Sequence, residues 1–445
     1  MTDNTESIVK RAVLVGVNTG RDPDFDISMK ELSGLAEACG YEVAGTSCQN
    51  LTRVENSTYI GKGKLQELKT FMEATDAGTA IFLNTLTPSQ LSNLCTELDS
   101  EVLDKTGLIL NIFSERARTV EAKMQVESAR LKYMLPRLSG LRKNLSRQGG
   151  TGGSMSNKGS GEKQTELDRR HIERRLADLR RGLESVERER ETQRRRRQRE
   201  GMPLVALVGY TNAGKSTLMN KILEYCDSSE EKAVLAKDML FATLDTTVRR
   251  VQTGKGRGFL LSDTVGFIHD LPHDLVKAFR STLEEAKTAD LLLHVVDYSD
   301  DSRERQIKVT EDTLKELGAS DIPVIYVMNK ADRVLTSDEF LKDASAYENR
   351  TEKREGGLPF IRGNSIYMSA KSGEGIEELI SMINSKLFED WLSVKLLVPY
   401  SEGRIENELR NSALTDSVEY RKEGIYIKCS IGKRLLGRYR EYIID

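Results

Sequence analysis

The sequence predicts an α/β protein of several domains, and three observations support that prediction. Apolar strand-like runs alternate with helical runs over residues 11–113. Two long charged segments with a heptad stripe follow, joined by a glycine-rich segment. A glycine-rich phosphate-binding pattern then appears directly after an apolar strand. A length of 445 residues is enough for about three domains with separate cores.

Composition narrows the class of protein. Charged residues make up 31% of the chain, so part of it is expected to be extended and washed by solvent. A net charge of −2 gives no overall attraction to nucleic acid, so any basic surface must be local. The five cysteines show no C-x-x-C spacing, and the first residues are polar and acidic. No apolar run approaches the roughly 18 residues of a membrane span. We therefore expect a soluble, cytoplasmic protein without disulfides, zinc or membrane insertion.

The N-terminal part predicts a domain with a largely parallel sheet. Strands are expected at 12–17, 41–44, 80–83 and 107–110, and helices at 29–39 and 64–74. The loop Tyr-Ile-Gly-Lys-Gly-Lys at 59–64 has two interpretations. It is either a phosphate- or RNA-contacting loop or an ordinary turn with solvated lysines.

Residues 116–147 and 162–200 predict the arms of an antiparallel helical hairpin, with the glycine-rich segment 148–161 at its tip. In each arm apolar residues recur at alternating intervals of four and three residues, and only Glu127 breaks this pattern. The apolar residues are Val120, Met124, Leu131, Met134, Leu138, Leu141 and Leu145 in the first arm, and Ile172, Leu176, Leu179, Leu183 and Val186 in the second. A charge run on a long helix is usually only a solvated face. The basic residues of the first arm nevertheless favour folded RNA as a partner; they are Arg116, Arg118, Lys123, Arg130, Lys132, Arg137, Arg142, Lys143 and Arg147.

Residues 209–216 match G-x-x-x-x-G-K-[ST] between an apolar strand, 204–208, and a helical run that starts at Thr217. In that context backbone N–H groups and the helix N-terminus face phosphate oxygens. Lys215 is expected to reach the β- and γ-phosphates, and the Ser216 hydroxyl to bind Mg²⁺.

Two further motifs complete the phosphate side. Asp263 ends an apolar strand in D-x-x-G and is expected to hold Mg²⁺ through water, while the Gly266 N–H bonds the γ-phosphate. Residues 241–247 are the candidate first switch, and Thr243 is the preferred further magnesium ligand by its position. Phe267 stands where a glutamine would orient the attacking water, so unaided hydrolysis should be slow. His269 and His273 lie nearby, but such histidines are more often surface or helix-start residues.

The base side reads N-K-x-D at 329–332. Asp332 can accept hydrogen bonds from guanine N1–H and N2–H₂, which adenine does not offer. Lys330 is expected along the ring and Asn329 against the phosphate loop, while the loop at 369–371 offers an N–H to guanine O6. GTP is therefore the expected substrate.

The predicted nucleotide site comprises Gly209, Tyr210, Thr211, Asn212, Ala213, Gly214, Lys215, Ser216, Thr217, Phe241, Ala242, Thr243, Leu244, Asp245, Asp263, Thr264, Val265, Gly266, Asn329, Lys330, Ala331, Asp332, Ser369, Ala370 and Lys371. Within it, Lys215, Thr243 and Gly266 are predicted to act in catalysis. Ser216, Thr243 and Asp263 are predicted to hold Mg²⁺.

Over essentially its whole length the chain resembles the HflX family of translational GTPases. The marks are FATLD (241–245), DTVGFI (263–268), LPHDL (271–275), YIGKGK (59–64), GLIL (107–110), RART (116–119) and VPY (398–400). Ser160, Thr246 and Asn84 depart from the family pattern. The resemblance implies a GTPase that binds the large ribosomal subunit and rescues or splits ribosomes under stress.

The expected domains are an N-terminal α/β domain (1–114), the hairpin (115–200), a Ras-like GTPase domain (201–390) and a small α+β domain (391–445). We expect a monomer. Two other functions compete with the ribosomal one. The first is an RNA-remodelling or RNA-chaperone protein that acts through its N-terminal half and is regulated by GTP. The second is a regulator of a non-ribosomal protein complex.

Overall fold

The computed structural model describes residues 10–20, 22–138, 157–200, 202–226, 241, 247–253, 257–264, 266–268, 285–334, 358–389, 391–432 and 436–444. The described residues up to Val186, together with Phe241, form one compact unit, and those from Glu187 onward, apart from Phe241, form a second. No helix in the described ranges is long and apolar enough to cross a membrane.

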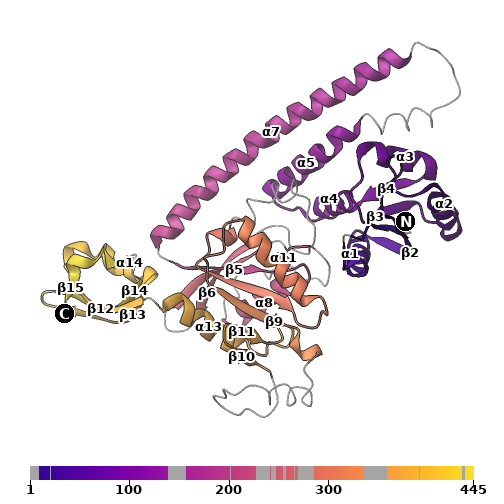
Figure 1. Cartoon of the computed structure of the whole chain (residues 1–445). Helices are drawn as coiled ribbons and strands as arrows, with labels where there is room; N and C mark the ends of the chain where they lie inside the picture. The colour runs from indigo at the N-terminus through magenta and orange to yellow at the C-terminus, as the bar shows by residue number, and fades with distance from the viewer. Residues whose placement is uncertain are drawn as a thin grey trace, which may run out of the picture. The chain divides into compact units, whose positions relative to one another are not determined.

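The N-terminal unit contains a parallel sheet with the strand order β2-β1-β3-β4 (Figure 1). Its elements are β1 (Lys10–Asn18), α1 (Phe25–Ala38), β2 (Tyr41–Asn50), α2 (Lys62–Thr75), β3 (Thr79–Phe82), α3 (Pro88–Leu98) and β4 (Glu101–Asp104). Alternate residues of β1 (Val13, Val15 and Val17) join one buried cluster with residues of α2 and α3. The predicted parallel sheet is confirmed.

The strand predicted at 107–110 is wrong, because these residues lie in helix α4 (Lys105–Arg116). Asp104 ends the preceding strand and caps the helix by accepting the Gly107 N–H at 2.8 Å. Residues 108–110 are all buried in the helix. A helix that is apolar on all sides shows no periodicity that would separate it from a buried strand.

The loop at 59–64 turns into α2, with Gly61 as its N-cap. The Gly61 N–H donates to the side chain of Gln49, and Lys64 pairs with Glu67 one helical turn later. Lys62 is exposed. These contacts support the interpretation as an ordinary turn with solvated lysines.

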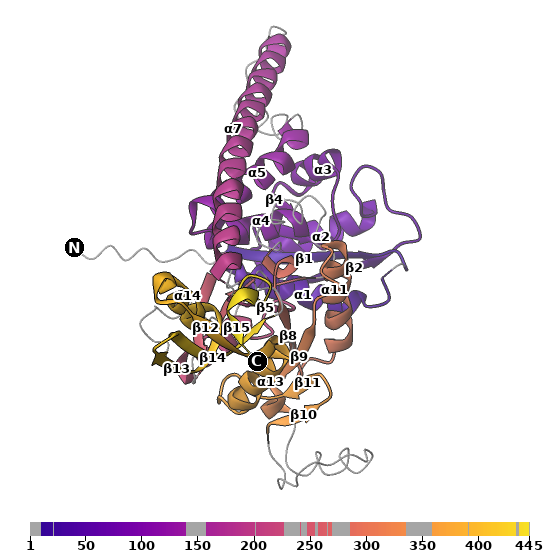
Figure 2. The same cartoon turned by 90° about the vertical axis from the view of Figure 1, so that its left-hand side faces the viewer.

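The hairpin arms are α5 (Val120–Met134), which continues into η1 (Leu135–Arg137), and α7 (Asn157–Glu200). Figures 1 and 2 show α5 beside α7. The Arg175 guanidinium donates to both carboxylate oxygens of Glu127, at 2.6 and 2.8 Å. Gly182 lies seven residues after Arg175 on α7, and it faces Met124, which lies three residues before Glu127 on α5. The arms therefore run antiparallel, as predicted.

In the stripe predicted on the first arm, Met124, Leu131, Met134 and Leu138 are half-buried, whereas Val120 is 74% exposed. The fully buried residues Ala122, Gln125, Val126 and Ala129 lie outside that stripe. This arm also packs on α4, so the N-terminal domain determines which side is buried. On the second arm, Leu179 is buried and the other members of its stripe are half-buried between exposed residues, as predicted. Residues 148–156 of the predicted tip and the first-arm residues Leu141, Arg142, Lys143, Leu145 and Arg147 lie outside the described residues. Residues 157–161 were also predicted in the tip, but they form the start of α7, so the second arm begins five residues earlier than predicted.

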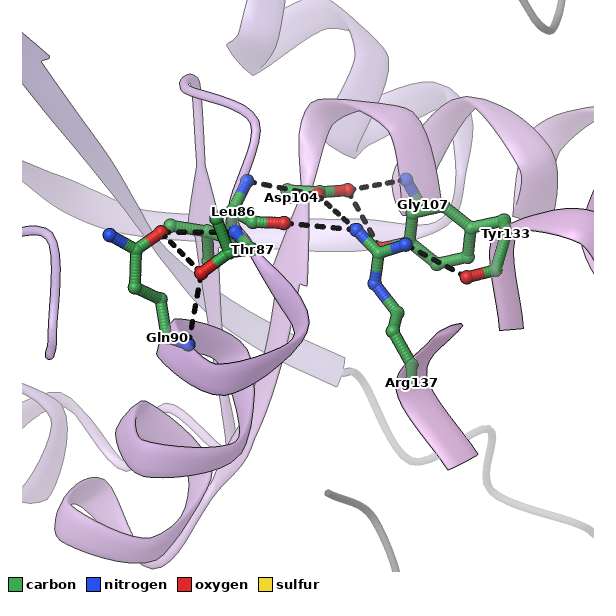
Figure 3. Close-up of polar contacts among 7 residues, drawn as sticks. All are labelled: Leu86, Thr87, Gln90, Asp104, Gly107, Tyr133 and Arg137. Carbon is green, nitrogen blue, oxygen red and sulfur yellow. Dashed lines mark hydrogen bonds and ion pairs between the residues drawn. The ribbon is translucent and has the colours of Figure 1, made fainter. Parts of the chain in front are cut away.

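Arg137 does not present its charge to solvent, which corrects its place among the RNA-facing residues. One Nη donates to the Tyr133 carbonyl oxygen at 2.8 Å, and the other donates to the Leu86 carbonyl at 3.0 Å and to Asp104 at 3.3 Å (Figure 3). The fully buried Asp104 also accepts from Tyr133 Oη at 2.8 Å and from the Leu86 N–H at 3.2 Å. The end of the first arm is thereby attached to the sheet.

The second unit begins with a seven-stranded sheet in the order β10-β11-β9-β8-β5-β7-β6. The strands are β5 (Leu204–Val208), β6 (Thr247–Thr253), β7 (Arg257–Asp263), β8 (Leu291–Asp297), β9 (Val324–Asn329), β10 (Phe360–Arg362) and β11 (Ser365–Tyr367). Helices α8 (Lys215–Tyr225) and α13 (Ile376–Phe388) pack on one face and α11 (Arg303–Glu316) on the other. The five central strands are parallel, so their carboxyl ends share one edge.

A separate small sheet follows, in the order β13-β14-β12-β15 and antiparallel throughout. It consists of β12 (Trp391–Val398), β13 (Leu414–Arg421), β14 (Gly424–Gly432) and β15 (Ile443–Ile444), with α14 (Arg404–Ser412) against it. Leu396, Leu409 and Ile427 belong to its own hydrophobic core. The expected small α+β fold is confirmed.

Candidate nucleotide site

The phosphate loop connects β5 to α8 at the shared carboxyl edge of the sheet. Gly209 has a φ of 144°, and a Cβ there would collide with the Val295 carbonyl oxygen. Gly214 has a φ of 96° and would collide with the side-chain amide of Asn329. Only glycine fits at either position. Helix α8 begins directly afterwards, at Lys215, so its first backbone N–H groups face the loop.

Lys215 is buried inside this loop. Its ammonium donates to the carbonyl oxygens of Gly209, at 3.1 Å, and Tyr210, at 2.8 Å. Burial lowers the pKa of Lys215 to about 8, and the nearby Asp263 carboxylate opposes that shift only in part. Neutral carbonyl groups do not balance a buried charge, so the loop favours an anionic ligand.

The predicted magnesium ligands Ser216 and Asp263 lie together. Ser216 Oγ donates to Asp263 Oδ2 at 2.7 Å, and Asp263 is fully buried at the end of β7. The neighbouring Thr264 hydroxyl donates to the Leu207 carbonyl of β5 at 2.6 Å, which holds the strand end in place. A hydroxyl beside a carboxylate is the kind of oxygen donor that Mg²⁺ prefers, so the residues fit that ion. Thr243, with Ala242, Leu244, Asp245 and Val265, lies outside the described residues.

The D-x-x-G segment lies directly against the phosphate loop. The Phe267 N–H donates to the Gly209 carbonyl at 3.1 Å, and the Thr211 N–H donates to the Phe267 carbonyl at 2.8 Å. A Cβ on Gly266 would lie 2.9 Å from Lys215 Nζ. The Phe267 ring is buried in an apolar cluster with Val208 and Leu292. His269 and His273 lie outside the described residues.

The base-side motif is joined to the phosphate loop by side chains. Asn329 donates to the Ala213 carbonyl and accepts the Ala370 N–H, both at 2.8 Å, which confirms that it braces the loop. The Lys330 ammonium donates to the Asn212 carbonyl at 2.8 Å. Asp332 lies in the short helix η2 (Ala331–Arg333) with its side chain exposed. Within the loop at 369–371, which was expected to offer an N–H to guanine O6, the Ala370 N–H is occupied by Asn329.

The family models match three parts of the chain. They are described as GTP-binding GTPase N-terminal (residues 26–114), GTP-binding GTPase Middle Region (116–197) and 50S ribosome-binding GTPase (204–330). The GTPase HflX of Caldanaerobacter subterraneus is 41% identical over 436 residues, covering 98% of this chain and 94% of that protein. The chain belongs to the HflX family of GTPases.

Two further comparisons describe its relatives. The GTPase HflX of Escherichia coli is 38% identical over 398 residues, covering 89% of this chain and 88% of that protein. A solved GTP-binding protein of Sulfolobus solfataricus, in complex with GDP, is 26% identical and covers 85% of this chain and 99% of its own, with a TM-score of 0.43. The resemblance seen in the sequence is confirmed: this HflX-family protein binds and hydrolyses GTP.

Two side chains of this HflX-family GTPase were not foreseen. Asp297 ends β8 and lies 2.6 Å from the Lys330 ammonium. A carboxylate at the end of an apolar strand is the signal that identified Asp263, and it was available at Asp297 as well. His294, in the same strand, is buried with an Nδ1 that has no hydrogen-bond partner among the described residues. Burial, and to a lesser extent the charge of Lys215, lower the pKa of His294 to about 4.

Proposed function

We propose that this HflX-family protein is a magnesium-dependent GTPase of the cytoplasm whose effector is the large ribosomal subunit. In this proposal it acts as a monomer in the rescue or splitting of ribosomes under stress. The observation that supports a switch is the contact of Gly266 and Phe267 with the phosphate loop. A segment so close to Lys215 must respond when a γ-phosphate arrives.

Each residue would act through a simple electrostatic contact. The Lys215 ammonium neutralises charge on the β- and γ-phosphates, and the Gly266 N–H bonds the γ-phosphate. Ser216 and Thr243 would hold Mg²⁺ directly, and Asp263 would hold it through water. The ion would supply positive charge that offsets the charge of the phosphates. Asp332 reads the guanine edge, for which its exposed carboxylate is accessible.

The buried ring of Phe267 supports slow turnover by the protein alone. An orienting group would then have to come from a rearrangement or a partner. The proposal of a ribosomal partner is supported by the model that matches residues 204–330, whose description is a 50S ribosome-binding GTPase. The long hairpin, attached to the N-terminal domain through Arg137, is the element we assign to that contact.

The test is to measure GTP hydrolysis with and without purified large subunits, together with co-sedimentation in a GTP analogue and in GDP. We expect binding in the analogue to exceed binding in GDP, and turnover to rise about 10³-fold or more with subunits. Binding should weaken as salt rises, because phosphate contacts release counterions. Equal rates with and without subunits would contradict the ribosomal role. Preferential binding and unwinding of free RNA would favour the RNA-remodelling alternative.

A further inference from the structure

Asp297 holds a charged contact that the proposed roles do not use. Its Oδ2 lies 2.6 Å from Lys330 Nζ, and each side chain is only 16% exposed. Its Oδ1 accepts the backbone N–H of Ser299 at 3.0 Å and the Ser299 hydroxyl at 2.6 Å. Both carboxylate oxygens are thereby occupied, so the orientation of Asp297 is fixed from its own loop.

Lys330 connects two parts of the nucleotide site. Its Nζ also donates to the carbonyl of Asn212 in the phosphate loop. Lys330 comes directly after β9, and its backbone lies in the left-handed region with a φ of 59°. The Tyr298 N–H donates to the Asn329 carbonyl at 2.8 Å, which ties the ends of β8 and β9 together. The stem of Lys330 is therefore fixed at both ends.

A lysine with a free ammonium would sample many rotamers, and ordering it costs conformational entropy. The ion pair with Asp297 orders Lys330 before any ligand is present. It also places the ammonium where it contacts the Asn212 carbonyl, so the base-reading segment and the phosphate loop share one side chain. Preorganisation of this kind raises affinity without a new ligand contact.

We propose that Asp297, oriented by Ser299, is a positioning residue for guanine binding. It holds the stem of Lys330 as the apolar side of the base pocket. This inference rests on the proposed role of the N-K-x-D segment. Because the base is common to GTP and GDP, loss of Asp297 should weaken both nucleotides equally. The phosphate contacts of Lys215 and Ser216 would remain, so turnover at saturating GTP should not change.

The test compares three variants of the full chain by dissociation of a fluorescent GDP, Kd for GTP and GDP, and steady-state kinetics. Asp297→Asn keeps the shape but loses the charge, and a charge-assisted hydrogen bond is worth enough for about a tenfold rise in both Kd values. Ser299→Ala should act in the same direction by about threefold. Asp300→Asn is the matched control, because Asp300 lies on the same loop but contacts Ser302 and Gln306 instead.

The expected pattern is a raised KM, faster GDP release, an unchanged kcat and partial rescue by Asp297→Glu. A merely structural role would lower kcat and thermal stability together, and that result would overturn the inference. So would unchanged affinity in both Asp297→Asn and Ser299→Ala. Asp332→Asn is measured in parallel with xanthosine triphosphate. If it alters base preference while the Asp297 and Ser299 variants do nothing, only this inference fails. If it also has no effect, the proposed base site fails with it.

Discussion

Two of the buried clusters of charged groups in the described part of the chain can be compared, because each lies at the carboxyl edge of a parallel sheet. In the N-terminal unit, Asp104 accepts four hydrogen bonds and pairs with Arg137. In the GTPase unit, the hydrogen bonds that Lys215 donates to described residues go to the neutral carbonyls of Gly209 and Tyr210. The hydroxyl of Thr211 beside it is buried with no partner among the described residues. In the first cluster the charge of Arg137 is balanced by Asp104, although Arg137 Nε has no hydrogen-bond partner among the described residues. In the second cluster the charge of Lys215 is balanced by a ligand.

The comparison also shows that a carboxylate at the end of a parallel strand has a different role in each unit. A carboxylate at a strand end caps a helix at Asp104 and accepts a hydrogen bond from the Ser216 hydroxyl of the phosphate loop at Asp263. Removing a residue of the Asp104–Arg137 cluster should therefore lower the free energy of unfolding. Removing a residue of the Lys215 cluster should instead lower the rate of GTP hydrolysis.

The largest effect is expected at Asp104→Asn. This change leaves the buried Arg137 without its counter-charge, which typically costs about 3–5 kcal/mol. Hydrogen exchange of the α4 amides should report that loss, while GTP hydrolysis is retained. Glu127→Gln is the control, because the Glu127–Arg175 pair is largely exposed and such pairs contribute about 1 kcal/mol or less. A similar loss in both variants would contradict the distinction.

Lys215→Ala should have the opposite profile. Removing the ammonium from the phosphate loop should lower kcat at least about 10²–10³-fold, the cost of losing one electrostatic stabiliser of the transition state. Thermal stability should be unchanged or slightly raised, because a buried charge without a carboxylate partner is lost. Undiminished hydrolysis would place the active site elsewhere. Thermal scanning with a single-turnover GTPase assay measures both.

Asp332→Asn should change which base is accepted. The amide cannot accept both guanine hydrogens, so GTP affinity should fall about 10²-fold, the cost of a hydrogen bond to a charged group. Xanthosine triphosphate should bind better than to the unchanged protein. Competition binding with the two nucleotides checks both. Unaltered preference would mean that Asp332 does not read the base.

His294 gives the smallest effect, and it depends on pH. Its folded-state pKa of about 4 lies below its usual 6.5, so the unfolded chain binds the proton first as pH falls. Stability of the GTPase unit should be level above pH 6.5 and fall by about 2 kcal/mol from pH 6.5 to 5. His294→Gln should flatten that part of the profile in thermal unfolding. An unchanged slope would show that another group causes it.

Local motifs predicted which of the described residues lie together around the phosphate loop, because strand, loop and helix fix these residues relative to one another. Ser216 and Asp263 meet because their strands are adjacent and parallel, and Asn329 reaches the phosphate loop from the strand beyond β8. Helix α4 was missed because its burial on all sides removes the periodic signal. The fully buried side of the first arm was missed because it packs on α4, which sequence spacing does not record.

Proton uptake on nucleotide binding tests most directly whether an anion completes the Lys215 cluster. With a pKa of about 8, Lys215 is half-protonated at pH 8, where a terminal phosphate is already ionised. Titration calorimetry of GDP at pH 8, in buffers of different ionisation enthalpy, should show uptake of about half a proton, and affinity should fall as pH rises further. Binding enthalpies that do not depend on the buffer would contradict the account.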